Sequence, residues 1–132
     1  MYEPKLPIFI VNNEDENIII ASSLGFAEGR MEPTEVEEGY FVVLDAAGRK
    51  ANLRIDRWAV SVESWSDYGD LPELLSRIAK FLSYHSLVFG DALDDEDYIS
   101  KASRLISIEN YSVNWPRKPR WLRRLIHGAE PK

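Results

Sequence analysis

The densest group of potential metal ligands is the acidic run of residues 91–97, which contains four aspartates and one glutamate. A calcium loop of the EF-hand type needs acids at alternate positions, a central glycine and a distal glutamate. The run has neither that spacing nor an internal glycine. Acids are also favoured in the first turn of a helix, because they face the positive end of its dipole. We therefore expect a helix to begin within residues 94–97, and we expect no metal ion and no cofactor.

The remaining reactive residue types form no catalytic motif. The chain has no cysteine, and its two histidines, His85 and His127, are far apart in the sequence. His85 falls on the apolar face of a predicted helix, which favours a packed, hydrogen-bonded role. No serine lies in a Gly-x-Ser-x-Gly elbow, and there is no phosphate-binding glycine loop or dinucleotide fingerprint. We expect no catalytic residues; the alternative is a small soluble enzyme whose site is assembled from scattered acidic and polar residues.

Residues 65–70, WSDYGD, combine aromatic side chains with carboxylates on a predicted loop. Such a combination is typical of a surface that binds a basic protein. The structural alternative is that Trp65 and Tyr68 cover the core and the start of the next helix. With the acids of the later run, the candidate partner-binding residues are Trp65, Asp67, Tyr68, Asp70, Asp94, Asp95 and Asp97.

Charge is unevenly distributed along the chain. The net charge is −6, but residues 1–116 carry 10 Lys+Arg and 21 Asp+Glu, whereas residues 117–132 carry six basic residues and one acid. An acidic body repels nucleic acid and anionic lipid and attracts basic proteins. We therefore expect a basic protein partner, no nucleic acid and no membrane. The oligomeric state is left open, with a self-associating structural protein as a third alternative.

The basic segment of residues 115–127, WPRKPRWLRRLIH, has two interpretations. Cations and indoles together are typical of a nucleic-acid or membrane-surface patch. They also suit an amphipathic closing helix whose tryptophans complete the core while its arginines face the acidic body. The net charge of −6 opposes binding to a polyanion, so we expect the closing helix.

The length and the N-terminal sequence restrict the number of domains and the cellular location that we expect. A chain of 132 residues fits one domain, 1–132. No apolar run reaches the roughly 20 residues that a membrane-spanning helix needs. The first residues carry acids where a signal peptide needs basic residues. We expect a cytoplasmic protein.

The rest of the chain is expected to be arranged around residues 39–65, whose sequence predicts three consecutive strands. Residues 50–55 and 58–63 alternate between apolar and polar side chains, as in strands buried on one face. Residues 40–44 are apolar on both faces, so that strand is either central or covered on its second face by a helix. Asp45 and Gly48 occupy the positions that a type I turn favours. The second turn, around Asp56 and Arg57, is either a tight turn or a bulge in one longer strand.

The other segments predict a hairpin and two helices. Residues 8–11 and 18–21 read as paired strands. Residues 22–38 read as an exposed connection containing either a strand near 24–27 or a helical turn near 34–38. A helix begins after the N-cap Asp70, with Glu73 completing a capping-box-like pair, and stops near Gly90. In the second helix, residues 106–113 could instead start a last strand.

Together these elements predict an α+β fold: an antiparallel sheet of about five strands, with two main helices packed on one face and a short C-terminal helix. In size, acidity and build the chain resembles the small immunity proteins of bacterial toxin systems, with the resemblance centred on residues 39–55 and the helix of residues 70–82. The resemblance implies a non-enzymatic single domain that binds and blocks a cognate toxin. No family motif is matched, so no functional residue is carried over.

Overall fold

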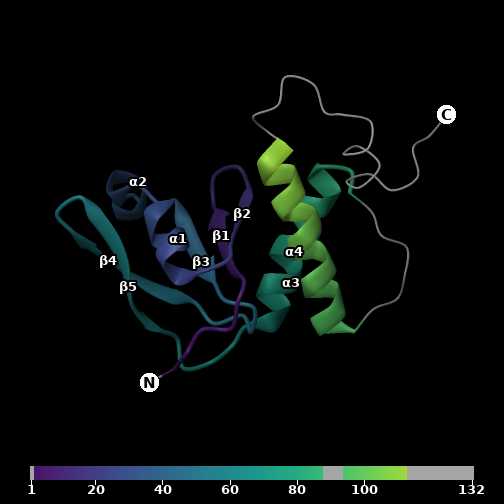
Figure 1. Ribbon diagram of the computed structural model, residues 1–132, viewed down its shortest axis with the longest axis horizontal. Coiled ribbons are helices and arrows are strands. Elements are labelled where there is room, and N and C mark those ends of the chain that lie inside the picture. The colour runs from purple at the N-terminus through teal and green to yellow at the C-terminus, as the bar shows by residue number, and fades with distance from the viewer. Residues whose placement is uncertain (1, 88–93, 113–132) are drawn as a thin grey trace.

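The computed structural model describes residues 2–87 and 94–112 of the protein (Figure 1). Helices and antiparallel strands are both present, which confirms the α+β class. In chain order the elements are β1 (Ile8–Asn12), β2 (Ile18–Ala21), α1 (Leu24–Gly29), α2 (Pro33–Glu37), β3 (Phe41–Leu44), β4 (Ala51–Asp56), β5 (Ala59–Trp65), α3 (Leu71–Tyr84) and α4 (Asp95–Ser112).

The five strands are divided between two sheets, where we expected one. The first sheet has the order β2-β1-β3, and the second is the β4-β5 hairpin. An isolated bridge from Leu44 to Lys50 joins the two sheets of the described residues. The pairing of β4 with β5 has a register shift between Asn52 and Leu53, where Glu63 of β5 is the extra residue without a partner. A shift of this kind increases the local bend and twist of a strand.

The three-stranded sheet is covered on both faces, because alternate side chains of β1 enter two different cores. Phe9 and Val11 point toward α3 and α4, where Leu74, Ile78 and Ile106 are buried. Ile8 and Ile10 enter the second core, whose other members include Val43, Val60, Ala27 and Met31. Figure 1 shows α3 and α4 on one side of the sheet and α1, α2 and the β4-β5 hairpin on the other. The central strand is therefore β1, whereas β3 is an outer strand with both faces covered.

Residues 22–38 form two short helices. Ser23 caps α1 by accepting a hydrogen bond from the Phe26 amide at 3.1 Å, and α2 has a proline in its first turn. Serine at the N-cap and proline at the first position are both favourable starts for a helix. The predicted helical turn near residues 34–38 is confirmed, and the alternative strand near residues 24–27 is wrong.

The two turns of the β3-β4-β5 region are both tight. The Gly48 amide donates to the Asp45 carbonyl at 3.0 Å, and Gly48 has a φ of +83°, which confirms the first turn. Arg57 and Trp58 form the second turn, with Arg57 at a φ of +58°, so the alternative of a bulge there is wrong. Trp58 lies at the tip and is 91% exposed, although the alternation placed it on the buried face.

Both long helices begin where we expected, and Asp70 is confirmed as the N-cap of α3. The predicted capping-box-like pair is wrong in its second half, because the Asp70 amide donates to the Gly48 carbonyl at 2.8 Å and the Glu73 carboxylate contacts Lys50 instead. The Asp70 carboxylate accepts from the Glu73 amide at 3.0 Å, and the Asp94 carboxylate accepts from the Asp97 amide at 2.8 Å. Helix α3 ends at Tyr84, earlier than we expected, and His85 follows as its C-cap. Helix α4 continues through residues 106–112, so the alternative of a last strand is wrong for these residues. Gly90, His127 and the predicted C-terminal helix lie outside the described residues.

Candidate functional site

A buried carboxylate holds the N-terminal segment against the body of the protein. Asp45 is fully buried and accepts hydrogen bonds from the backbone amides of Lys5, Ala47 and Arg49, each at 3.0 Å. Its second oxygen also accepts a hydrogen bond from the Tyr2 hydroxyl. Because one side chain serves both its own turn and residues 2–5, the turn and the N-terminal segment are fixed together.

This anchoring places Tyr2 among three side chains from distant positions in the sequence. Its ring meets that of Trp65 edge to face, with 6.4 Å between centroids. The Arg49 guanidinium lies 3.8 Å from the centroid of the Tyr2 ring, a cation–π contact. Burial, followed by the hydrogen bond to Asp45, raises the pKa of Tyr2 above its ordinary value of 10.0. Tyr2 is therefore a neutral phenol that donates to Asp45 across the physiological pH range.

Beside this cluster lies an open groove of about 570 Å³ between the N-terminal segment and β5. Trp65 contributes an aromatic wall, and the Trp65 ring is partly buried against the second core. The groove is lined by Tyr2, Glu3, Pro4, Leu24, Arg49, Val62, Glu63, Ser64, Trp65 and Asp67.

The charge of the groove is predominantly negative. Glu3, Glu63 and Asp67 are exposed, and none of them forms an ion pair with another described residue. Arg49 is the one cation among the described lining residues, and its Nη1 lies 3.4 Å from the Ser66 carbonyl oxygen while its guanidinium covers Tyr2. Three carboxylates of the groove therefore have no cationic partner within residues 2–87 and 94–112, and a cation beside the aromatic wall would be favoured there.

The predicted residues of the WSDYGD loop divide between this groove and the start of α3. Trp65 and Asp67 line the groove. Asp70 caps α3, so its carboxylate is already used by the Glu73 amide. Tyr68 is 85% exposed and lies outside the groove lining, with its carbonyl accepting from the Ser66 hydroxyl at 2.9 Å.

The other predicted acids are at the start of α4 and do not line the groove. Asp94 is the N-cap, and Asp95 and Asp97 lie in the exposed first turn. A smaller cavity of about 200 Å³ lies between residues 5–7 and this end of α4, and its acidic lining residue is Glu96. The structure therefore does not bring Asp94, Asp95 and Asp97 together with Trp65 in one described cavity.

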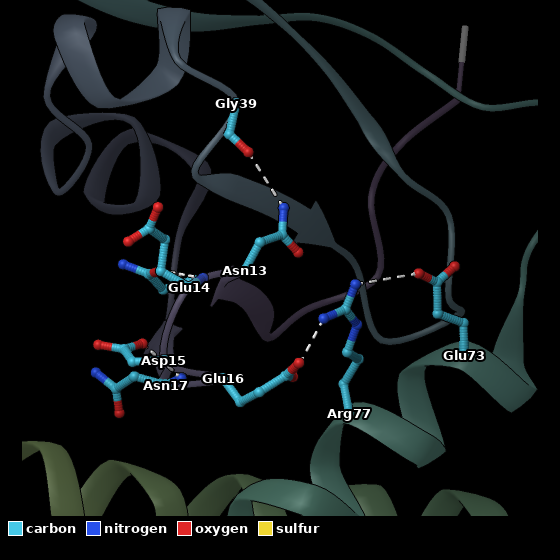
Figure 2. Close-up of polar contacts among 9 residues, drawn as sticks. Asn13, Glu14, Asp15, Glu16, Asn17, Gly39, Glu73 and Arg77 are labelled. Atoms are coloured by element: carbon cyan, nitrogen blue, oxygen red, sulfur yellow. Dashed lines mark hydrogen bonds and ion pairs between the residues drawn. The ribbon is translucent and has the colours of Figure 1, made fainter.

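A second group of acids stabilises the contact between α3 and the first hairpin. Figure 2 shows Arg77 between Glu16 of the β1-β2 loop and Glu73 of its own helix. The Arg77 nitrogens lie 3.2 Å from Glu16 Oε2 and 3.7 Å from Glu73 Oε1, and Lys50 adds a contact of 2.8 Å to Glu73. These carboxylates already have cationic partners, so they are poorer candidates for a ligand than those of the groove.

Eight of the ten residues that line the groove were absent from the prediction, among them Tyr2, Glu3 and Glu63. Glu63 is one of the polar residues on the exposed face of β5. Tyr2 and Glu3 precede the first predicted strand, and nothing in their local sequence connects them with Trp65. The sequence indicated only that Asp45 is a turn residue. Its burial and the hydrogen bonds that it accepts from the Lys5, Ala47 and Arg49 amides are seen in the structure alone.

The remaining titratable residues form no metal-binding group within the described segments. No set of three or more histidine, aspartate or glutamate side chains there is arranged to hold a metal ion. His85 packs on Phe81 with 4.2 Å between ring centroids, and its Nδ1 lies 3.4 Å from Glu109 Oε1. These contacts support the expected packing role for His85. No helix among residues 2–87 and 94–112 is long and apolar enough to cross a membrane.

Comparison of the chain with protein-family models, curated proteins and solved structures finds no match.

Proposed function

We propose that this protein is a non-enzymatic, acidic binding module that engages a basic segment of a partner protein through the groove beside Trp65. The observation that carries the proposal is the combination of an aromatic wall with three exposed carboxylates that lack an ion-pair partner among the described residues, Glu3, Glu63 and Asp67. A toxin domain neutralised in the cytoplasm, as in the immunity proteins that the chain resembles, is the partner class that we propose.

The groove chemistry suits a lysine or arginine side chain. The methylene stem of such a side chain can lie along an aromatic face, while its charged end remains near carboxylates and water. An arginine would form charge-assisted hydrogen bonds with two of the acids, and an aromatic ring nearby adds a cation–π contribution. Residues 1–116 carry 21 acidic and 10 basic residues, so long-range attraction of a basic protein supplements the local contacts.

A pull-down with matched charge variants tests the proposal. The chain, immobilised by a tag at the C-terminus, is exposed to native bacterial lysate at low and at high salt. The groove variant is E3Q/E63Q/D67N. The control variant E14Q/E32Q/E37Q removes the same charge from exposed positions that do not line the groove. We expect a basic protein to be retained at low salt by the native chain and the control, and to be lost from the groove variant.

Two results would contradict the proposal. Failure of the native chain to retain any basic protein at low salt would remove its basis. Equal loss from the groove variant and the control would show that net charge acts without the groove. Far-ultraviolet circular dichroism of the three chains excludes unfolding as the cause of a loss.

A further inference from the structure

Neither outer edge of the β4-β5 hairpin forms a ladder with another described strand. The β5 edge faces α1, where Glu28 accepts from the Val62 amide, so the edge of β4 is the free one. Strand β4 pairs with β5 on one side, and beyond the isolated bridge at Lys50 no described strand pairs with its other side. Figure 1 shows the hairpin extending away from the three-stranded sheet to its tip. The distal residues of the strand, Arg54, Ile55 and Asp56, are exposed.

The register identifies which backbone groups face outward from this edge. The Val62 amide donates to Glu28 Oε2 at 2.7 Å, so it points away from β4 and the Leu53–Val62 pair is not hydrogen-bonded across the hairpin. Hydrogen-bonded and non-hydrogen-bonded pairs alternate along an antiparallel ladder. Arg54–Ser61 is therefore a hydrogen-bonded pair and Ile55–Val60 is a non-hydrogen-bonded pair. The amide and carbonyl of Ile55 therefore point outward from the free edge of β4.

The charges on either side of Ile55 are complementary to those of a second copy of the same strand. Residues 54, 55 and 56 are arginine, isoleucine and aspartate, so charges of opposite sign flank the outward-facing residue. Arg54 and Asp56 share the exposed face of the hairpin, and Ile55 lies on the other face, where 38% of it remains exposed. In an antiparallel pair of identical strands centred on Ile55, each Arg54 would be directly opposite Asp56 of the second chain.

We infer that two copies of this chain associate through β4, in an antiparallel pairing centred on Ile55 that joins the two hairpins into a four-stranded sheet. The two-fold axis passes beside Ile55, so the pairing supplies its two outward hydrogen bonds, an isoleucine–isoleucine contact and two ion pairs. A closed two-fold interface of this kind uses the same surface patch on both chains. The register also brings Trp58, which is 91% exposed, to the start of β4 in the second chain.

The sign pattern favours a second copy over an unrelated strand. Exposed edge strands commonly carry charges that discourage pairing with other chains. Like charges directly opposite each other have that effect, whereas opposite charges across a strand pair stabilise it. In the pairing centred on Ile55 the two charged positions meet with opposite sign, so here the charges select one register.

Charge exchange provides the test, with sedimentation velocity of the full chain over a range of protein concentrations as the measurement. The variants are R54D, D56R and the exchange R54D/D56R. R54D places two aspartates opposite each other twice, so the dimer dissociation constant should rise at least about tenfold. D56R should do the same through opposed arginines. The exchange variant restores opposite charges and should dimerise like the native chain, and an equimolar mixture of R54D and D56R should form mixed dimers.

The proposal would be overturned by a native chain that remains monomeric at the highest soluble concentration. It would equally be overturned by an R54D chain that dimerises as strongly as the native one, or by an exchange variant that remains as weak as R54D. Thermal unfolding of each variant shows whether the hairpin is intact, because residues 54 and 56 are exposed and their exchange should leave the fold unchanged.

Discussion

Asn110 and Ile20, which are 90 residues apart in the sequence, are joined by a hydrogen bond of 3.1 Å from the Ile20 amide to Asn110 Oδ1. Asn110 Nδ2 also donates to the Ile18 carbonyl at 2.8 Å. The side-chain amide of a helix residue thus takes the position that a neighbouring strand would occupy at the outer edge of β2. This contact satisfies one donor and one acceptor of an edge strand and fixes α4 against the sheet.

Replacing Asn110 should destabilise the protein more than replacing an exposed asparagine. N110A leaves the Ile20 amide and the Ile18 carbonyl without these partners in a partly buried place, so the free energy of unfolding should fall by about 1–3 kcal/mol. The control is N52A, which removes an exposed hydrogen bond of 2.8 Å to Ser64. Urea unfolding followed by circular dichroism gives both values, and equal stabilities for the two variants would contradict the edge-capping role.

Gly48 should tolerate no side chain, because two constraints act on it together. Its φ is +83°, and a Cβ atom there would lie 2.6 Å from the backbone carbon of Asp70. Gly39 has a similar φ of +78° with no atom within 4 Å of the added Cβ, so G39A measures the conformational strain alone. We expect G39A to cost about 1 kcal/mol and G48A at least about 2 kcal/mol more. Thermal unfolding measures both, and equal losses would show that the loop before α3 moves freely away.

Asp45 should be essential for the N-terminal side of the groove. In D45N an amide replaces one carboxylate oxygen and faces backbone N–H donors, so the free energy of unfolding should fall by about 2–3 kcal/mol. The control is D67N, an exposed change that should stay within about 0.5 kcal/mol. Hydrogen exchange at the Lys5 amide provides a local measurement, because that amide donates to Asp45 at 3.0 Å. Unchanged protection of Lys5 in D45N would contradict the anchoring role.

The raised pKa of Tyr2 predicts a loss of stability at alkaline pH. The neutral phenol is favoured in the folded state, so the contribution is fully present below the ordinary pKa of 10.0 and is lost as pH rises through the folded value. Y2F removes the titrating group and should show a smaller fall in stability above that pH than the native chain. Y98F is the comparison, because burial raises the pKa of Tyr98 in another part of the protein. Urea unfolding at a series of alkaline pH values gives the free energy of unfolding of each chain, and tyrosinate absorbance follows the ionisation. Identical pH dependence of that free energy in Y2F and the native chain would contradict the prediction.

Local sequence patterns predicted most of the individual elements. The first hairpin, the three strands of residues 39–65 and the starts of both long helices depend on alternation, turn residues and acidic side chains within a few positions of one another. Helix α3 and its buried residues Leu74 and Ile78 followed from 3.6-residue periodicity alone. The end of α3 was missed because its C-cap is His85 with Ser86 at a φ of +56°, where the nearest glycine in the sequence is Gly90.

Two of the ten residues that line the groove were also predicted. Trp65 and Asp67 were selected because an aromatic and an acid follow a strand on a loop, and both line the groove. Tyr2 and Glu3 were not, because their position depends on hydrogen bonds to Asp45 that span 40 residues and more. Asp94, Asp95 and Asp97 were grouped with the loop of residues 65–70 because of their charge alone. In the structure Asp94 caps α4 by accepting from the Asp97 amide.

The sequence by itself determined the fold class, the acidic character and the local identity of the strands and helices, since these depend on composition and short-range periodicity. Tertiary structure decided that β1 is the central strand and that the five strands divide into two sheets. It also decided that residues 2–4 meet β5 in a groove. The physical reason is that sheet order, the division into two sheets and the burial of Asp45 depend on packing between segments distant in the chain. Such packing leaves no periodic pattern in the local sequence.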